Sequence, residues 1–122
     1  MAKHAEDAVL DGLLDVVATS TILCVCSALP ATYAEMTATY DLATHIMAAG
    51  DFAKADDGTG RKLTVAAQAA ITVDHTAAAV NVCLGISGTT TLLYCTSCTS
   101  QVLTAANTVT VPAWVISVAD AT

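Results

Sequence analysis

The fold is decided by one run in the second half of the chain, Leu63-Thr64-Val65-Ala66-Ala67-Gln68-Ala69-Ala70-Ile71-Thr72-Val73. Apolar residues alternate in this run with small or polar ones. A period of two is typical of a β-strand, whose successive side chains point to opposite faces of a sheet. The run therefore predicts a single strand over residues 62–73, with Gln68 on its outward face. The predicted inward face consists of Leu63, Val65, Ala67, Ala69, Ile71 and Val73.

Similar runs follow toward the C-terminus. Residues 78–86 predict a strand, and residues 90–101 and 108–118 predict others. The inward face of the strand at 78–86 is expected to carry Ala78, Val80, Val82, Leu84 and Ile86. Turn residues separate these runs at 74–76, 87–89 and 105–107. Several short strands joined by turns predict a mainly β chain, folded as an antiparallel β-sandwich or a barrel-like domain.

Two large or rigid residues mark the last run. Pro112 has no N–H to donate to a neighbouring strand, so it predicts a sheet edge or a bend. Trp114, the single tryptophan, is expected to fill the core or an interface.

The first part of the chain predicts a helix followed by short strands. In residues 5–18 the apolar residues Val9, Leu10, Leu13, Leu14, Val16 and Val17 follow a helical spacing. Asp7, Asp11 and Asp15 recur every four residues and predict a solvated opposite face, with a cation site as the alternative. Strands are expected at 21–28, 42–47 and 50–55, with a loop or short helical turn at 31–40. We therefore expect one domain, made of an N-terminal helix (1–20) and a β-sandwich (21–122).

Composition bounds the possible functions. The chain has 122 residues, of which 55% are hydrophobic and 12% charged, and its net charge is −7. It has no run of about 20 uninterrupted apolar residues, so no membrane-spanning helix is expected. Lys3, Lys54, Arg61 and Lys62 form no basic stripe, which argues against nucleic acid and anionic membranes as partners. A surface so poor in charge predicts extensive contact with other subunits.

The five cysteines allow three interpretations. Cys24 and Cys26 could join the Cys95-x-x-Cys98 pair in a zinc site, although this spacing fits zinc motifs poorly. A Cys95–Cys98 disulfide would need a turn between the two residues. The N-terminus is acidic and lacks the apolar core of a signal peptide, so the chain is expected to fold in a cytoplasm, where thiols stay reduced. Buried free thiols, including that of Cys83, are the favoured interpretation.

No catalytic constellation is apparent. The segment 56–60, Asp-Asp-Gly-Thr-Gly, resembles part of a calcium loop but lacks the later acidic ligand, so it predicts a hairpin turn. His4, His45 and His75 have no evident nucleophile beside them, and residues 85–88 do not form a nucleophile elbow. We therefore assign no catalytic, cofactor-binding or metal-binding residues and expect neither an enzyme nor a small-molecule substrate.

Several segments resemble a known family. They are Cys26-Ser27-Ala28-Leu29-Pro30-Ala31-Thr32-Tyr33-Ala34-Glu35, Thr39-Tyr40-Asp41-Leu42-Ala43, Gly50-Asp51-Phe52, Asp57-Gly58-Thr59-Gly60-Arg61-Lys62-Leu63-Thr64-Val65-Ala66-Ala67, and the tail from Leu92 to Gln101 with Asn107-Thr108-Val109 and Val111-Pro112-Ala113. Together they are similar to small structural proteins of tailed bacteriophages and prophages.

This resemblance implies a virion component made in the cytoplasm of a host bacterium, and the expected role is that of a capsid decoration (cement) protein on the outer surface of the head. The implied partners are the major capsid protein and copies of the chain itself, by the habit of such proteins as a homotrimer. The N-terminal helix is expected either to anchor the chain on a partner or only to cover one end of the β-sandwich. The alternatives are another virion part (tail, head–tail connector or fibre-associated protein), a cysteine-based metal or redox module, and a carbohydrate-binding sandwich, which the low aromatic content disfavours.

Overall fold

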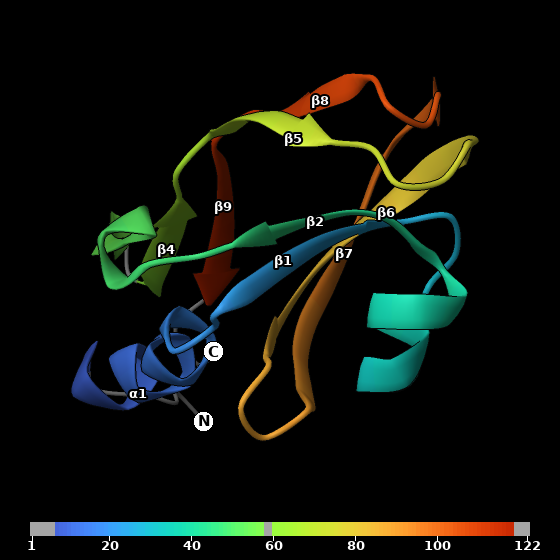
Figure 1. Cartoon of the computed structure of the whole chain (residues 1–122). Helices are drawn as coiled ribbons and strands as arrows, with labels where there is room; N and C mark the ends of the chain where they lie inside the picture. Colours follow the sequence, from blue (N-terminus) through green and yellow to red (C-terminus); the bar gives the residue numbers. More distant parts are fainter. Residues whose placement is uncertain (1–6, 58–59, 119–122) are drawn as a thin grey trace.

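A computed structural model describes residues 7–57 and 60–118 of the chain. The first layer of its fold is a four-stranded antiparallel sheet (Figure 1). Its strands are β1 (Ile22–Cys26), β2 (Asp41–Ile46), β6 (Ala77–Ile86) and β7 (Thr91–Leu103), in the spatial order β2-β1-β6-β7. The two central strands are rich in valine, leucine and cysteine, which suits strands that are covered on both faces.

The second layer consists of two smaller antiparallel sheets. One is β3-β4-β9, formed by β3 (Phe52–Asp57), β4 (Gly60–Val65) and β9 (Trp114–Val118). The other pairs β5 (Gln68–Thr72) with β8 (Thr108–Val111). The helix α1 (Asp7–Ala18) packs at one end of the sandwich, next to β3 and β4 (Figure 1). Two short helical turns, η1 (Glu35–Thr39) and η2 (Ala49–Asp51), lie in the connections on either side of β2.

The main core lies between the two layers. It contains Leu23 and Val25 from β1, Leu63 and Val65 from β4, and further aliphatic side chains from most of the remaining strands. Leu14 of α1 is 1% exposed and belongs to the same cluster. Burial of these aliphatic side chains is the main stabilising contribution in a chain with so few aromatic residues.

A second, smaller cluster covers the outer face of the four-stranded sheet. It consists of Cys24, Cys26, Met36 and Cys83, each 0% exposed, and Tyr33 and Tyr40 are packed around them. Met36 comes from η1, whose helical form is fixed by two hydrogen bonds to Glu35. The Tyr40 N–H donates to the carbonyl oxygen of Glu35 (2.8 Å), and the Ala31 N–H donates to its carboxylate (2.9 Å).

The sequence predicted this class of fold correctly. The mainly β antiparallel architecture, the single N-terminal helix and a helical turn within 31–40 are all confirmed. The turns at 87–89 and 105–107 are also present, and Pro112 lies in the bend between β8 and β9. β3 and β4 pair as the hairpin expected around residues 56–60, although residues 58 and 59 lie outside the described residues, as do residues 5 and 6 of the predicted helix.

The prediction of one strand over 62–73 is wrong. The chain leaves β4 after Val65 and enters a different sheet as β5, so Ala67 and Ala69 are exposed and Gln68 is buried. Ala70 has a positive φ of 56°, and the pairing of β5 with β8 is irregular between Gln68 and Ile71. Alanine tolerates either face of a sheet, so the alternation of the sequence concealed the break. Gln68 offsets its burial by donating from Nε2 to the carbonyl oxygen of Ala66 (3.2 Å).

The predicted inward face of residues 78–86 is only partly correct. Val82 and Leu84 lie in the main core, as expected. The pairing of β6 with β7 shifts between Ala79 and Asn81, however, and this irregularity turns Ala79 inward in place of Ala78 and Val80. The opposite face is also buried, because the second cluster covers Cys83 there.

Gly85 of β6 has no room for a side chain beside the second cluster. A Cβ atom added there would lie 2.6 Å from the carbonyl oxygen of Thr91 and 2.8 Å from Cε of Met36. We predict that Gly85→Ala lowers the free energy of unfolding by about 1–3 kcal/mol, measured by urea denaturation.

The matched control is Gly12→Ala on α1, where an added Cβ meets nothing within 4 Å. Because alanine favours the helix, this substitution should raise stability by about 0.5–1 kcal/mol. Equal stability of Gly85→Ala and the wild type would contradict the close packing described at β6.

Candidate interaction surface

The helix α1 carries two apolar stripes, of which only one is buried. Leu10 (4% exposed) and Leu14 (1%) face the β-sandwich, and Val17 packs against the core beside them. Val9 and Leu13 are 61% and 58% exposed, and Val16 is 55% exposed. Their spacing of four and three residues places these three side chains on one face of the helix. We call Val9, Leu13 and Val16 the outer stripe.

Asp11 and Asp15 of α1 face the β3–β4 hairpin, where they form ion pairs. Arg61 of β4 donates from Nε to Oδ1 of Asp11 (2.8 Å) and also pairs with Asp56. Lys54 of β3 pairs with Asp15, with 2.6 Å between Nζ and Oδ1. The expectation of a solvated acidic face is therefore wrong for Asp11, whose side chain is 23% exposed. The side chain of Asp7 lies outside the described residues.

The ion pairs shift the pKa values of Asp11, Lys54 and Arg61. The hydrogen bond from Arg61 holds the pKa of Asp11 below its ordinary value. The hydrogen bond to Asp15 raises the pKa of Lys54, and the hydrogen bonds to Asp11 and Asp56 raise that of Arg61. Asp11, Lys54 and Arg61 are therefore charged near neutral pH, and their ion pairs hold the polar side of α1 against the hairpin.

All five cysteines are free, and Cys24, Cys26 and Cys83 are buried as the favoured interpretation expected, whereas Cys95 is half-buried. Cys24, Cys83 and Cys95 lie directly opposite one another on β1, β6 and β7, and Cys26 lies beside them in the same cluster. Cys98 is exposed and is not part of this cluster. A zinc site formed by Cys24, Cys26, Cys95 and Cys98 is thus not brought together. Among residues 7–57 and 60–118, no group of three or more histidine, cysteine or acidic side chains is arranged to hold a metal ion.

The thiols of the cluster are poor nucleophiles. Burial raises the pKa of Cys24 to about 12, although the Thr44 hydroxyl lies 3.5 Å from its Sγ. Hydrogen bonding with the Cys26 thiol, together with burial, raises the pKa of Cys83 far above its ordinary value. Burial also raises the pKa values of Cys95 and Cys98. A thiol reacts as its thiolate, so the buried Cys24 and Cys83 behave as small apolar side chains.

The two histidines within the described residues, His45 and His75, lie on or beside β2. Nδ1 of His75 lies 2.9 Å from the carbonyl oxygen of Asp41, and the half-buried His45 lies on β2. Asp41, which the sequence did not single out, is 9% exposed and accepts a hydrogen bond from the Thr44 hydroxyl (2.8 Å). Burial raises the pKa of Asp41. His4 lies outside the described residues.

Comparisons of the chain with protein-family models, with curated proteins and with solved structures found no match. Within the described residues, none of the helices has the length and apolarity needed to cross a membrane. The likeness to phage structural proteins thus stays a prediction from sequence motifs.

The Asp11–Arg61 pair predicts acid sensitivity. An aspartate whose pKa is lower in the folded state stabilises the fold fully above its ordinary pKa of 3.8, and this contribution is lost as the pH falls through the folded-state pKa. We expect the unfolding free energy of the wild type to fall more steeply below about pH 4 than that of Asp11→Asn. Urea denaturation at a series of pH values measures this slope. Asp57→Asn, at the exposed end of β3, should keep the wild-type slope.

Cysteine exposure predicts an order of alkylation. With iodoacetamide at mildly alkaline pH, Cys98 should react first and Cys95 more slowly, while Cys24, Cys26 and Cys83 react only after unfolding. Mass spectrometry of the intact and digested protein measures this order. Rapid modification of Cys83 in the folded protein would contradict the buried cluster.

Proposed function

We propose that this chain is a virion structural protein that decorates the outer surface of a tailed-phage head and stabilises it. The proposal rests on the resemblance of the sequence motifs and on one structural observation, the outer stripe of α1. Three large aliphatic side chains exposed on one helix face are unusual for a free protein surface and fit a protein–protein contact.

The geometry supports an anchoring role for α1. The inner side of the helix already covers the end of the β-sandwich through Leu10 and Leu14, so the outer stripe is not needed for that purpose. The ion pairs of Asp11 and Asp15 hold the helix in place before any partner binds. A helix that is already positioned loses little conformational freedom on binding, which favours affinity.

The proposed partners are the major capsid protein and further copies of this chain. Leu29, Ile46 and Val102 are each more than 60% exposed, but they lie on separate segments and do not form a stripe like that of α1. The net charge of −7 repels nucleic acid, which suits a component that faces away from the packaged genome.

Quantitative mass spectrometry of purified particles, followed by cryo-electron microscopy, tests this proposal. Decoration requires a copy number close to that of the major capsid protein and density on the outer shell. A few copies at the portal or tail would instead assign the chain to another virion part, and complete absence from particles would refute both.

A substitution in the outer stripe tests the anchor. Leu13→Asp should weaken binding to undecorated heads by about 100-fold, because it buries an unpaired carboxylate at the contact. Ile46→Asp places the same charge on β2 at a side chain that is 82% exposed, and it should bind as the wild type does. Circular dichroism checks that both variants are folded. Full binding by Leu13→Asp would exclude the outer stripe as the anchor.

A further inference from the structure

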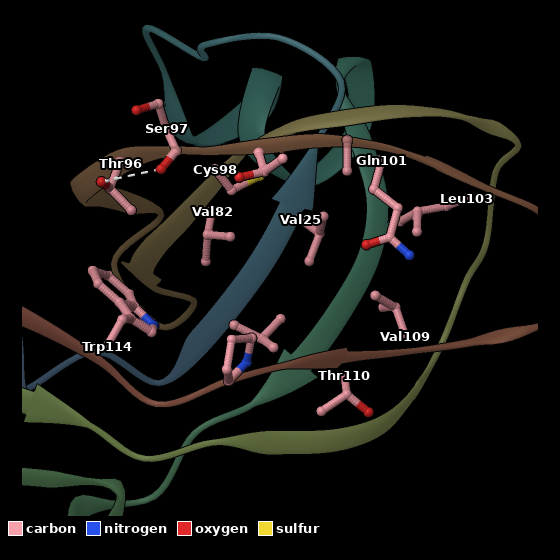
Figure 2. A pocket seen from close by; sticks show the side chains of 14 residues that line it. Val25, Val82, Thr96, Ser97, Cys98, Gln101, Leu103, Val109, Thr110 and Trp114 are labelled. Carbon is pink, nitrogen blue, oxygen red and sulfur yellow. Dashed lines mark hydrogen bonds between the residues drawn. The ribbon is translucent and has the colours of Figure 1, made fainter.

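A pocket of about 300 Å³ opens on the side of the sandwich between β7 and the β8–β9 segment (Figure 2). Its floor is apolar and includes Val25 and Val82 of the four-stranded sheet. Val109 and Leu103 continue this apolar wall (Figure 2). The volume lies at the lower end of the range of about 300–1,000 Å³ that is usual for small-ligand sites. No residue of α1 lines the pocket, so it is separate from the outer stripe.

The polar side chains of the pocket are uncharged, and hydroxyl and amide groups predominate among them: Thr96, Ser97, Thr99, Gln101 and Thr110. Gln101 and Thr110 lie on opposite sides of the opening, one on β7 and one on β8 (Figure 2). Cys98 is the one ionisable group among the described lining residues, and burial raises the pKa of its thiol, so it is neutral near pH 7. A charged ligand would lose its hydration here without gaining a counter-ion, which is unfavourable. A neutral ligand has no charge to desolvate and avoids this cost.

Trp114 supplies a hydrogen-bond donor in the pocket wall. Its ring stacks on Tyr94, with 6.0 Å between ring centroids, and this contact fixes the orientation of the indole. The Nε1 atom is buried and has no hydrogen-bond partner among the described residues. Figure 2 places this nitrogen on the side of the ring that faces the pocket. Because a buried donor without a partner is unfavourable, a ligand that brings an acceptor to it gains a hydrogen bond that the free protein lacks.

We propose that this pocket binds a small, neutral, largely apolar molecule that carries a carbonyl or hydroxyl oxygen. The apolar part of the ligand occupies the space over Val25 and Val82, and its oxygen accepts a hydrogen bond from Nε1 of Trp114. This binding site is independent of the proposed decoration of a phage head.

The single tryptophan makes the test direct. Cyclohexanone is the probe, and the readouts are the indole N–H signal of Trp114 and the valine and leucine methyl signals in nuclear magnetic resonance spectra. Cyclohexanone should bind with a dissociation constant on the order of 1 mM. Its binding should move the indole proton signal downfield and shift the methyl signals of Val25, Val82 and Val109. Cyclohexanecarboxylate, which has the same ring with a negative charge, should bind at least about tenfold more weakly.

Two variants separate the hydrogen bond from the shape of the pocket. Trp114→Phe keeps an aromatic ring against Tyr94 but removes the N–H, and it should bind cyclohexanone about tenfold more weakly, as followed by the methyl signals. Val109→Phe fills the pocket and should abolish binding. Val102→Phe adds the same ring on β7 at a side chain that is 73% exposed and outside the pocket, and it should bind as the wild type does.

The proposal is overturned if cyclohexanone moves neither the indole signal nor the methyl signals of the lining residues up to its solubility limit. Tight binding of the carboxylate would refute the neutral character of the site. Wild-type affinity in Val109→Phe would show that the probe binds elsewhere. Because the indole signal is read in the wild-type protein, the test remains decisive if a variant fails to fold.

Discussion

The structure depends on one packing constraint, which is that β1 and β6 are buried on both faces although the chain has few large side chains. Leu23, Val25 and Leu84 meet the second layer on one side. On the other side Cys24 and Cys83 need a cover of their own, and η1 provides it by placing Met36 over them. Cysteine suits this position because it is small, apolar when protonated and compatible with a strand. The close approach of Met36 and Thr91 to Gly85 is a result of the same thin layer.

The two proposals assign different tasks to different parts of the molecule. α1, held by Arg61 and Lys54, presents aliphatic side chains that suit a protein partner. The side of the sandwich beside Trp114 presents a small cavity that suits a neutral molecule. Neither task uses the thiols of Cys24, Cys26 and Cys83, whose burial gives them a role in packing rather than in chemistry.

The features that could be predicted from the sequence were those set by neighbouring residues. The helix, the turns and the antiparallel β class follow from local spacing, and the burial of Cys24, Cys26 and Cys83 follows from the apolar strands that contain them. The break after Val65 could not be predicted, because the alanines at 66, 67, 69 and 70 fit either face of a sheet and their environment is set by strands distant in the sequence. The partners of Asp11, the irregularity near Val80 and the cavity beside Trp114 likewise depend on pairings over long distances in the chain.

The ion pairs of α1 also determine the rotation of the helix about its own axis. Leu10 directly follows Val9, and Leu14 directly follows Leu13. Successive residues of a helix are rotated by about 100°, so a rotation of α1 by this angle about its axis would exchange the buried stripe for the exposed one. Both stripes are aliphatic, and hydrophobicity alone distinguishes them weakly. Asp11 and Asp15 resolve this near-symmetry, since only one roll angle brings both carboxylates to Arg61 and Lys54. Charged side chains that lie outside both stripes therefore determine which apolar stripe of α1 is exposed.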